Sequence, residues 1–135
     1  MAYIKFEELS SANLLFLDQP YAGRLIVLHE EDRTSSQWLV SFTLDVEKQQ
    51  VSVLTTNQEL IRKVRREGYA QVDQKQAGFL FSLRGSARLH TDTTKLATAK
   101  LAYEKRYQKT LKEDADGQLV EISIRSVYRL DLNKV

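Results

Sequence analysis

The sequence predicts an α+β domain in which six antiparallel strands form a small barrel and the helices lie on its periphery. Two segments, 78–90 and 118–133, alternate apolar and polar residues over lengths well above the usual strand of about 5–6 residues, which is typical of strands that bend around a barrel. Other apolar segments are separated by short polar turns, which favours antiparallel pairing because parallel strands need a crossover of about a dozen residues. The helices are segregated from the strand groups, as in the α+β class.

The first predicted element is a helix over residues 5–18. Pro20 is expected to end it, because proline disrupts a helix. Five residues of this helix fall on roughly one face, four of them apolar. They are Phe6, Leu9, Asn13, Phe16 and Leu17.

Three strands at hairpin spacing follow, over residues 24–31, 37–47 and 50–55. Polar turns separate them at 32–35 and 48–49. The middle strand alternates regularly, with one face made of Trp38, Val40, Phe42, Leu44 and Val46. These connections predict an antiparallel meander.

A short basic helix and two more strands come next. Thr56 with Glu59 matches a capping box at the start of the helix, and Gly68 fits the left-handed residue that ends one. A strand is predicted over 69–75 and a longer one over 78–90. Glycine in mid-strand weakens pairing unless a bulge or a close backbone contact requires it, so we expect a bend near Gly85. The inward face of this long strand is predicted to carry Phe79, Phe81, Leu83, Gly85, Ala87 and Leu89.

The last two elements are a helix and a strand. Asp92 is the predicted N-cap of a helix that runs to about Lys112, followed by an acidic turn at 113–117. The apolar stripe of this helix is Leu96, Ala99, Tyr103, Tyr107 and Leu111. The strand over 118–133 is predicted to turn inward Val120, Ile122, Ile124, Ser126, Tyr128, Leu130 and Leu132.

Composition narrows the function classes. The 135 residues predict one domain, 1–135, and the 42% apolar and 28% charged content is that of a soluble globular protein. The chain lacks cysteine, a run long enough to cross a membrane and a signal peptide, so the cytoplasm is the expected location. No cluster of Asp, Glu or His has the spacing of metal ligands, and a net charge of +2 is too small to indicate nucleic-acid binding.

Four features in order identify a family resemblance. They are a strand ending in threonine that enters a basic helix (VSVLTTNQELIRKVRR), the strand YAQVDQK, a glycine followed two residues later by alanine in residues 84–88, and a helix before the terminal strand VEISIRSVYRLDLN. This order resembles the FMN-binding split barrel of the pyridoxamine 5′-phosphate oxidase-like superfamily, from about Gly23 onward. The resemblance implies a six-stranded antiparallel split barrel that binds FMN at the interface of a homodimer.

The resemblance also implies which residues hold the cofactor. The phosphate would lie at the threonine-bearing strand end and at a basic residue of the following helix, and the ring would contact the second strand. Two arginines on the outer face of the long strand are expected to reach the ligand or the partner subunit, although paired charges on a solvent-exposed strand face explain them equally well. The resulting candidates are Ser41, Thr43, Thr55, Thr56, Arg62, Lys63, Arg84 and Arg88. Redox chemistry on a small-molecule substrate would come from the flavin, and no catalytic residue is predicted.

Alternatives follow from the same residues. The basic helix is also typical of a solvated face, and Thr56 is explained equally well as a cap. The same barrel would serve as a non-catalytic module that binds no flavin, or heme or another cofactor. Lysines interleaved with Tyr103 and Tyr107 resemble a nucleic-acid surface, but these tyrosines fall on the apolar stripe, so core packing and no nucleic-acid partner are expected.

Overall fold

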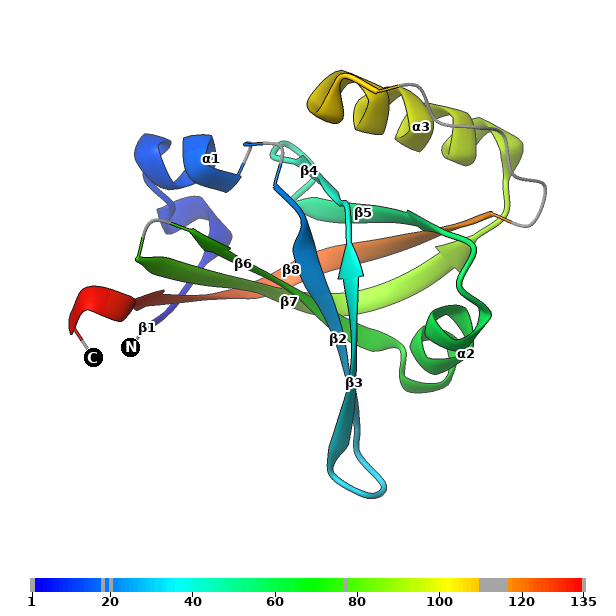
Figure 1. Ribbon diagram of the computed structural model, residues 1–135, viewed down its shortest axis with the longest axis horizontal. Coiled ribbons are helices and arrows are strands. Elements are labelled where there is room, and N and C mark those ends of the chain that lie inside the picture. The colour runs from blue at the N-terminus through cyan, green and yellow to red at the C-terminus, as the bar shows by residue number, and fades with distance from the viewer. Residues whose placement is uncertain (1, 18, 20, 77, 110–116, 135) are drawn as a thin grey trace.

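The computed structural model describes residues 2–17, 19, 21–76, 78–109 and 117–134. In chain order the elements are β1 (Ala2–Ile4), η1 (Phe6–Glu8), α1 (Ser11–Leu17), β2 (Gly23–His29), β3 (Thr34–Val40), β4 (Thr43–Asp45), β5 (Gln50–Thr55), α2 (Gln58–Glu67), β6 (Tyr69–Gln76), β7 (Phe79–His90), α3 (Thr93–Tyr107), β8 (Gln118–Asp131) and η2 (Leu132–Lys134). The strands curl around one core and the helices lie outside it, which confirms the α+β class (Figure 1).

The described strands form one antiparallel sheet in the order β3-β2-β6-β7-β8-β5-β4, and β1 pairs with β8 as an eighth strand. The prediction of six strands is therefore wrong in number. It missed β1, and the strand expected over 37–47 is divided into β3 and β4. The sheet is not closed by hydrogen bonds: β3 and β4 lie at its two edges, and the chain crosses from one edge to the other through Ser41 and Phe42. This is a split barrel.

The crossing between the two edges is held by the phenol of Tyr107. The Tyr107 hydroxyl donates to the Phe42 carbonyl at 2.7 Å and accepts from the Phe42 amide at 3.0 Å. The Phe42 side chain is fully buried, with the Arg106 guanidinium 4.4 Å from its ring centroid. Because the backbone groups of Phe42 bond to a side chain from α3, this residue leaves the strand ladder and β3 ends there.

The N-terminal segment differs from the single helix predicted over 5–18. It forms β1, η1 and then α1, and Asp18 and Pro20 lie outside the described residues. The reason is local capping: the Ser10 hydroxyl accepts from the Asn13 amide at 3.1 Å, which starts a new helix at Ser11. The apolar spacing was informative for burial nonetheless, because Phe6, Leu9 and Leu17 all lie in the core.

The two long strands, β7 and β8, pair along their whole length with one register shift, between Arg84 and Gly85. Arg84 pairs with Ser126 and Gly85 with Ile124, so Arg125 is an extra residue on β8. The predicted bend at Gly85 is confirmed. A Cβ at this position would lie 1.7 Å from the Ser123 carbonyl oxygen, so only glycine allows this approach.

The bulge reverses the alternation of β8, and this corrects the predicted inward face of the last strand. Before the bulge, Val120 and Ile122 are buried as predicted, but after it Val127 is buried, whereas Ser126 and Tyr128 are only half-buried on the other face. One extra residue moves every later side chain to the opposite face of a strand, and a strict period of two in the sequence does not reveal it.

The helix ends follow their local chemistry. Asn57, rather than the predicted Thr56, caps α2, because its side chain accepts from the Leu60 amide at 3.0 Å. Gly68 ends that helix with φ of 66°, and Asp92 caps α3 through the Thr94 and Lys95 amides, both as predicted. The third helix ends at Tyr107, earlier than expected, and the segment 110–116 lies outside the described residues.

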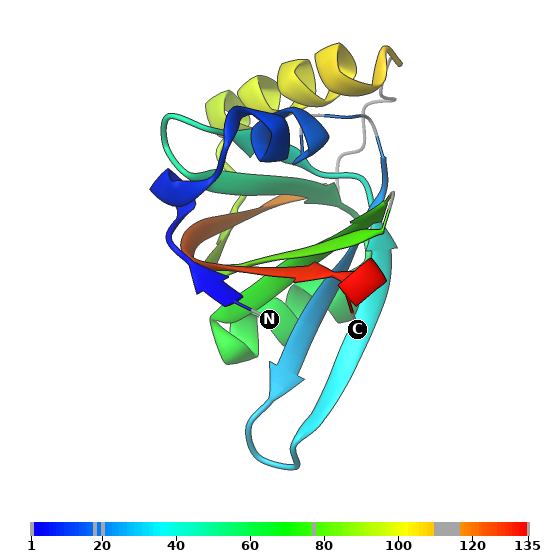
Figure 2. The same cartoon turned by 90° about the vertical axis from the view of Figure 1, so that its left-hand side faces the viewer.

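The helices are placed by what they cover. Three buried side chains of α2, Leu60, Ile61 and Val64, close one end of the barrel. The third helix lies over β4 and β5, on the side of the barrel away from α2, and the β2–β3 hairpin projects beyond the rest of the molecule (Figures 1 and 2).

We expect Gly85→Ala to lower the free energy of unfolding by about 3 kcal/mol or more, because backbone must move to admit the methyl group. Gly68→Ala is the matched control: a Cβ there meets nothing within 4 Å, and only its left-handed φ opposes alanine, at about 1 kcal/mol. Urea unfolding of the variants measures both. An equal loss in the two would contradict the close approach of β7 and β8.

We expect Tyr107→Phe to lower the free energy of unfolding by about 1–3 kcal/mol, because both backbone groups of buried Phe42 lose their partner. Tyr103→Phe is the control, since Tyr103 contacts Tyr107 through its ring, with centroids 4.7 Å apart. Losses of the same size in both variants would argue against a role for the phenol in holding the crossing.

The same variant has an expected pH dependence. Burial raises the pKa of the Tyr107 phenol above the ordinary value of 10.0, so the folded state holds this proton more tightly than the unfolded chain. The resulting stability is complete below pH 10 and is lost as the pH rises through the raised pKa. Urea unfolding should therefore show the difference between wild type and Tyr107→Phe shrinking above pH 10.

Candidate functional site

One candidate region is the end of the barrel where β5 enters α2. Thr55 ends β5, and its hydroxyl accepts from the Asn57 amide at 3.0 Å. Asn57 then caps the helix through the Leu60 amide, while Thr56 between them is exposed. The predicted threonines are therefore together at the helix N-terminus, where amide groups and the helix dipole favour an anion.

The basic side chains of α2 lie on the outside of this end. Arg62 is exposed and Lys63 is half-buried. Helical side chains lean toward the N-terminus, so Arg62 leans toward the turn that begins at Gln58. Arg66, one turn further on, forms an ion pair with Glu31 of the β2–β3 hairpin and so serves to attach the helix to the hairpin.

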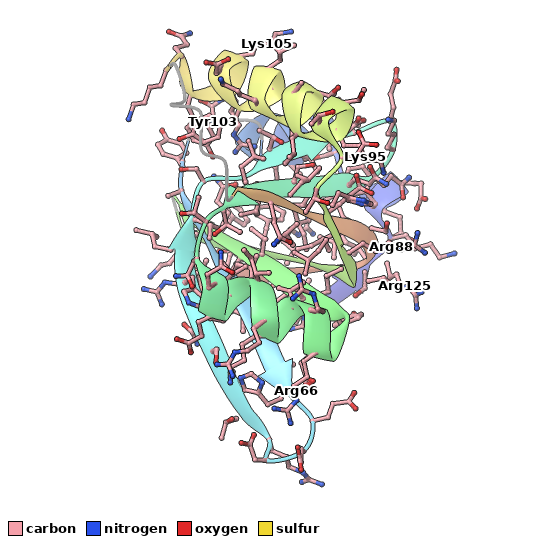
Figure 3. All side chains as sticks on the ribbon, turned by 90° about the vertical axis from the view of Figure 1, so that its right-hand side faces the viewer. Arg66, Arg88, Lys95, Tyr103, Lys105 and Arg125 are labelled. Atoms are coloured by element: carbon pink, nitrogen blue, oxygen red, sulfur yellow. The ribbon has the colours of Figure 1, made fainter. Side chains whose placement is uncertain are left out.

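The predicted arginines of the long strand lie on the outer face of β7. Arg84 packs over the Tyr128 ring, 5.7 Å from its centroid, and is half-buried. Arg88 is exposed and projects, like Arg125 of the bulge, from the edge of the molecule below Lys95 (Figure 3). Arg84 and Arg88 are four residues apart on the strand, which corresponds to about 13 Å between their Cα atoms.

A buried polar network lies beside Arg84. Asp73 of β6 accepts from the Ser82 hydroxyl at 2.5 Å and from the Gln71 amide group at 3.0 Å. Ser82 is 2% exposed although it is on the outer face of the barrel. This face therefore carries a hydrogen-bonded polar group with little solvent exposure, which the sequence analysis did not single out.

The remaining predicted residues are at the crossing from β3 to β4. Ser41 directly precedes Phe42 and so lies next to the fold-stabilising contact of the Tyr107 phenol described above. Thr43 opens β4 and faces Ser52 across the ladder. Ser52 in turn pairs with Glu121 of β8, and Glu121 pairs with Arg88 of β7.

The structure therefore distributes the eight predicted residues over four places, one of which is the crossing between β3 and β4 at Ser41. Thr55 and Thr56 lie just before the start of α2, and Arg62 and Lys63 lie in the middle of that helix. Arg84 lies on the outer face beside Tyr128. The fourth place is one row across four strands, made of Thr43, Ser52, Glu121 and Arg88.

Two members of that row, Ser52 and Glu121, were missed by sequence reasoning. Both alternate with apolar residues, so their polar face was visible in the sequence. What was missing was the register that puts them side by side, and register depends on pairing between distant segments.

A cavity of about 530 Å³ lies over this row, between α3 and the β4–β5 hairpin. Its lining combines carboxylates, lysines, hydroxyls and small apolar side chains, from Thr43, Leu44, Asp45, Val46, Glu47, Lys48, Gln50, Ser52, Thr94, Lys95, Thr98, Ala99, Ala102, Leu119 and Glu121. Of the eight residues predicted for a site, Thr43 is the one in this lining.

Within the part of the chain that the structure describes, no three His, Cys, Asp or Glu residues are grouped to hold a metal ion. No described helix combines the length and the apolar content that crossing a membrane requires.

No protein-family model matches the sequence, and no curated protein does. Solved structures do. A candidate 5-nitroimidazole antibiotic resistance protein from Bacteroides thetaiotaomicron matches with a TM-score of 0.75 and 10% identity, over 95% of this chain and 86% of that one. A candidate pyridoxamine 5′-phosphate oxidase from Listeria innocua matches with a TM-score of 0.68 and 16% identity, over 87% of this chain and 94% of that one.

A heme-binding protein from Mycobacterium smegmatis matches with a TM-score of 0.64 and 16% identity, over 84% of this chain and 50% of that one. At these identities the similarities establish the fold and leave the activity open. The chain has the split-barrel fold that its sequence resemblance predicted, and it shares this fold with the solved structures above.

Proposed function

We propose that this protein is a homodimeric FMN-binding flavoprotein that acts as an oxidoreductase on a small molecule. The observation that carries the proposal is the threonine-bearing end of β5 running into the basic helix α2 within a split barrel. The resemblance implies a flavin phosphate at this position, and the side chains present suit one.

The fit to a phosphate rests on three groups at the start of α2. The exposed Thr56 hydroxyl is a donor, the first-turn amides point out of the helix, and Arg62 supplies a planar pair of donors for phosphate oxygens. Glu59 in the same turn is exposed, so it is solvated and weakens the local potential only modestly. Lys63 is close enough in sequence to add a second positive charge.

The homodimer is proposed through the outer face of β2, β3, β6, β7 and β8. Leu39 is 78% exposed and Leu28 is 55% exposed, and both lie on this face with the half-buried Ile26, Leu80 and Leu130. Exposed apolar side chains around a buried polar network are typical of a subunit interface. A second copy on this face would also cover Arg84 and Tyr128, where a flavin ring would lie between subunits.

The flavin would supply the redox chemistry, by hydride or electron transfer at its ring. The chain's own residues would hold the phosphate, exclude water from the ring and set the polarity around it. The rigid hydrogen bonds of Asp73 with Ser82 and Gln71 would keep donors and acceptors in fixed positions near the ring.

A second candidate, a barrel that binds heme or no cofactor, is favoured by the similarity to a heme-binding protein. The two histidines offer little to an iron atom in this conformation. His29 is 6% exposed and hydrogen-bonds Ser36, and His90 lies beside Glu121. The visible spectrum of the purified protein separates the candidates, because flavin, heme and cofactor-free protein absorb differently.

We expect the purified protein to be yellow, or to bind added FMN with a Kd in the micromolar range or below. Arg62→Ala should weaken FMN binding about tenfold or more by removing a charged hydrogen bond to phosphate, and Lys105→Gln on α3 should leave it unchanged. Fluorescence quenching of FMN measures both. Colourless protein that fails to quench FMN would rule out the flavoprotein.

We expect Leu39→Asp to convert the dimer to a monomer and to reduce FMN binding, because it places a charge on the proposed interface. Size-exclusion chromatography with light scattering measures the mass. Leu101→Asp is the matched control, since Leu101 is 68% exposed on α3, away from this face. A wild-type protein that is monomeric at micromolar concentration would contradict the interface.

A further inference from the structure

The cavity between α3 and the β4–β5 hairpin has the features of a second ligand site. We propose that it binds a small organic cation, an ammonium or amidinium group attached to an apolar ring or chain, with the Glu121 carboxylate as the recognition group. The proposal does not depend on flavin binding, because the phosphate-binding groups of α2 are not in the lining of this cavity.

The floor of the cavity is a polar part of the sheet surface. Thr43, Ser52 and Glu121 are neighbours in one row across β4, β5 and β8, and Gln50 lies on the same face of β5. These side chains are all half-buried, and all of them line the cavity. Leu119, 3% exposed, adds an apolar part to the floor.

The roof is a face of α3 made of small side chains. Thr94, Thr98 and Ala102 recur every four residues, so they share one face of the helix, and all three line the cavity. These three residues remain exposed although they face the barrel, because α3 does not pack directly against the β4–β5 hairpin. Only Ala99, 8% exposed, is buried among the residues of α3.

The helix cannot close the cavity easily, because both of its ends are joined to the barrel. At its start, only Thr91 and Asp92 separate α3 from the end of β7. At its end, Tyr107 bonds the Phe42 backbone, and Arg106 donates to the Leu17 carbonyl at 2.7 Å. A cavity with a fixed roof is preformed, which lowers the cost of binding a ligand.

Charge selects the ligand class. The lining holds three carboxylates, from Asp45, Glu47 and Glu121, and two lysines. Asp45 is engaged by the Lys48 amide of its own turn, and both Asp45 and Glu47 are exposed, so water screens them. Glu121 differs, since its side chain is 18% exposed and lies on the floor.

Glu121 pairs with His90, whose Nε2 lies 3.4 Å from the carboxylate. This nitrogen is buried and has no hydrogen bond among the described residues. A half-buried carboxylate attracts a cation more strongly than an exposed one, because the lower dielectric strengthens the interaction. The hydroxyls of Ser52 and Thr43 beside it would accept the remaining hydrogens of an ammonium group.

The remaining surface selects an apolar body for the ligand. Leu44, Val46, Ala99 and Leu119 line the cavity next to the polar row. The volume of about 530 Å³ lies in the range of sites for small organic ligands, roughly 300–1,000 Å³, and exceeds what a bare metal ion or one ammonium ion requires.

The test uses the purified full chain and three probes of one shape: benzylamine, benzyl alcohol and benzoate. Titration followed by amide chemical shifts in NMR should show that benzylamine shifts the signals of Ser52 and Thr98, and that benzyl alcohol and benzoate bind about tenfold more weakly or not at all. Equal binding of all three probes, or no shift at these residues with benzylamine, would overturn the proposal.

Two variants test the residues separately. Glu121→Gln keeps the shape and removes the charge, so benzylamine should bind about tenfold more weakly. Ala102→Phe should abolish binding by filling the cavity from the roof, and Ala97→Phe, at an exposed position of α3 outside the lining, should not. Binding unchanged in both Glu121→Gln and Ala102→Phe would show that the cation lies elsewhere.

The outcome is separable from that of the FMN proposal. Benzylamine binding is read at Ser52 and Thr98 in protein with or without FMN, whereas FMN binding is read by quenching and by its loss in Arg62→Ala. Each proposal thus fails or stands on its own measurement.

Discussion

The fold depends on the close approach of β7 and β8 at Gly85. The missing side chain lets the Ser123 carbonyl come within 1.7 Å of where a Cβ would be, and Arg125 is then left over as an extra residue on β8. The extra residue reverses which side chains of β8 face inward, so Ile122 and Val127 both reach the core although an odd number of positions separates them. Two strands thereby serve both halves of the barrel.

A second constraint operates at the opposite side, where the sheet is split. The chain must pass from one edge to the other, and a residue in that passage loses its ladder partners. Tyr107 meets this need by bonding both backbone groups of Phe42. Because Tyr107 belongs to α3, the same contact fixes the helix above β4 and β5, and the cavity beneath that helix is a consequence of how the barrel edge is secured.

The candidate sites differ in how far the sequence could predict them. The group at the start of α2 is local: Thr55, Thr56 and Arg62 fall within eight consecutive residues, so a strand followed by a helix suffices to bring them together. The row under α3 is not local. Thr43, Glu121 and Arg88 come from three distant segments, and only the register of the paired strands puts them in one row. In the sequence alone, Arg88 is one of several charged residues on a solvent-exposed strand face.

Periodicity and capping chemistry are properties of neighbouring residues, and they were enough to predict the α+β class, the long strands, the bend at Gly85 and the caps at Gly68 and Asp92. The number of strands, the break at Phe42 and the inward face of the last strand were decided by contacts between segments far apart in the chain. A bulge or a side chain that bonds a distant backbone group changes the geometry without changing the local pattern. For this reason most helices and strands could be predicted from the sequence, whereas the cavity beneath α3 could be found only in the folded barrel.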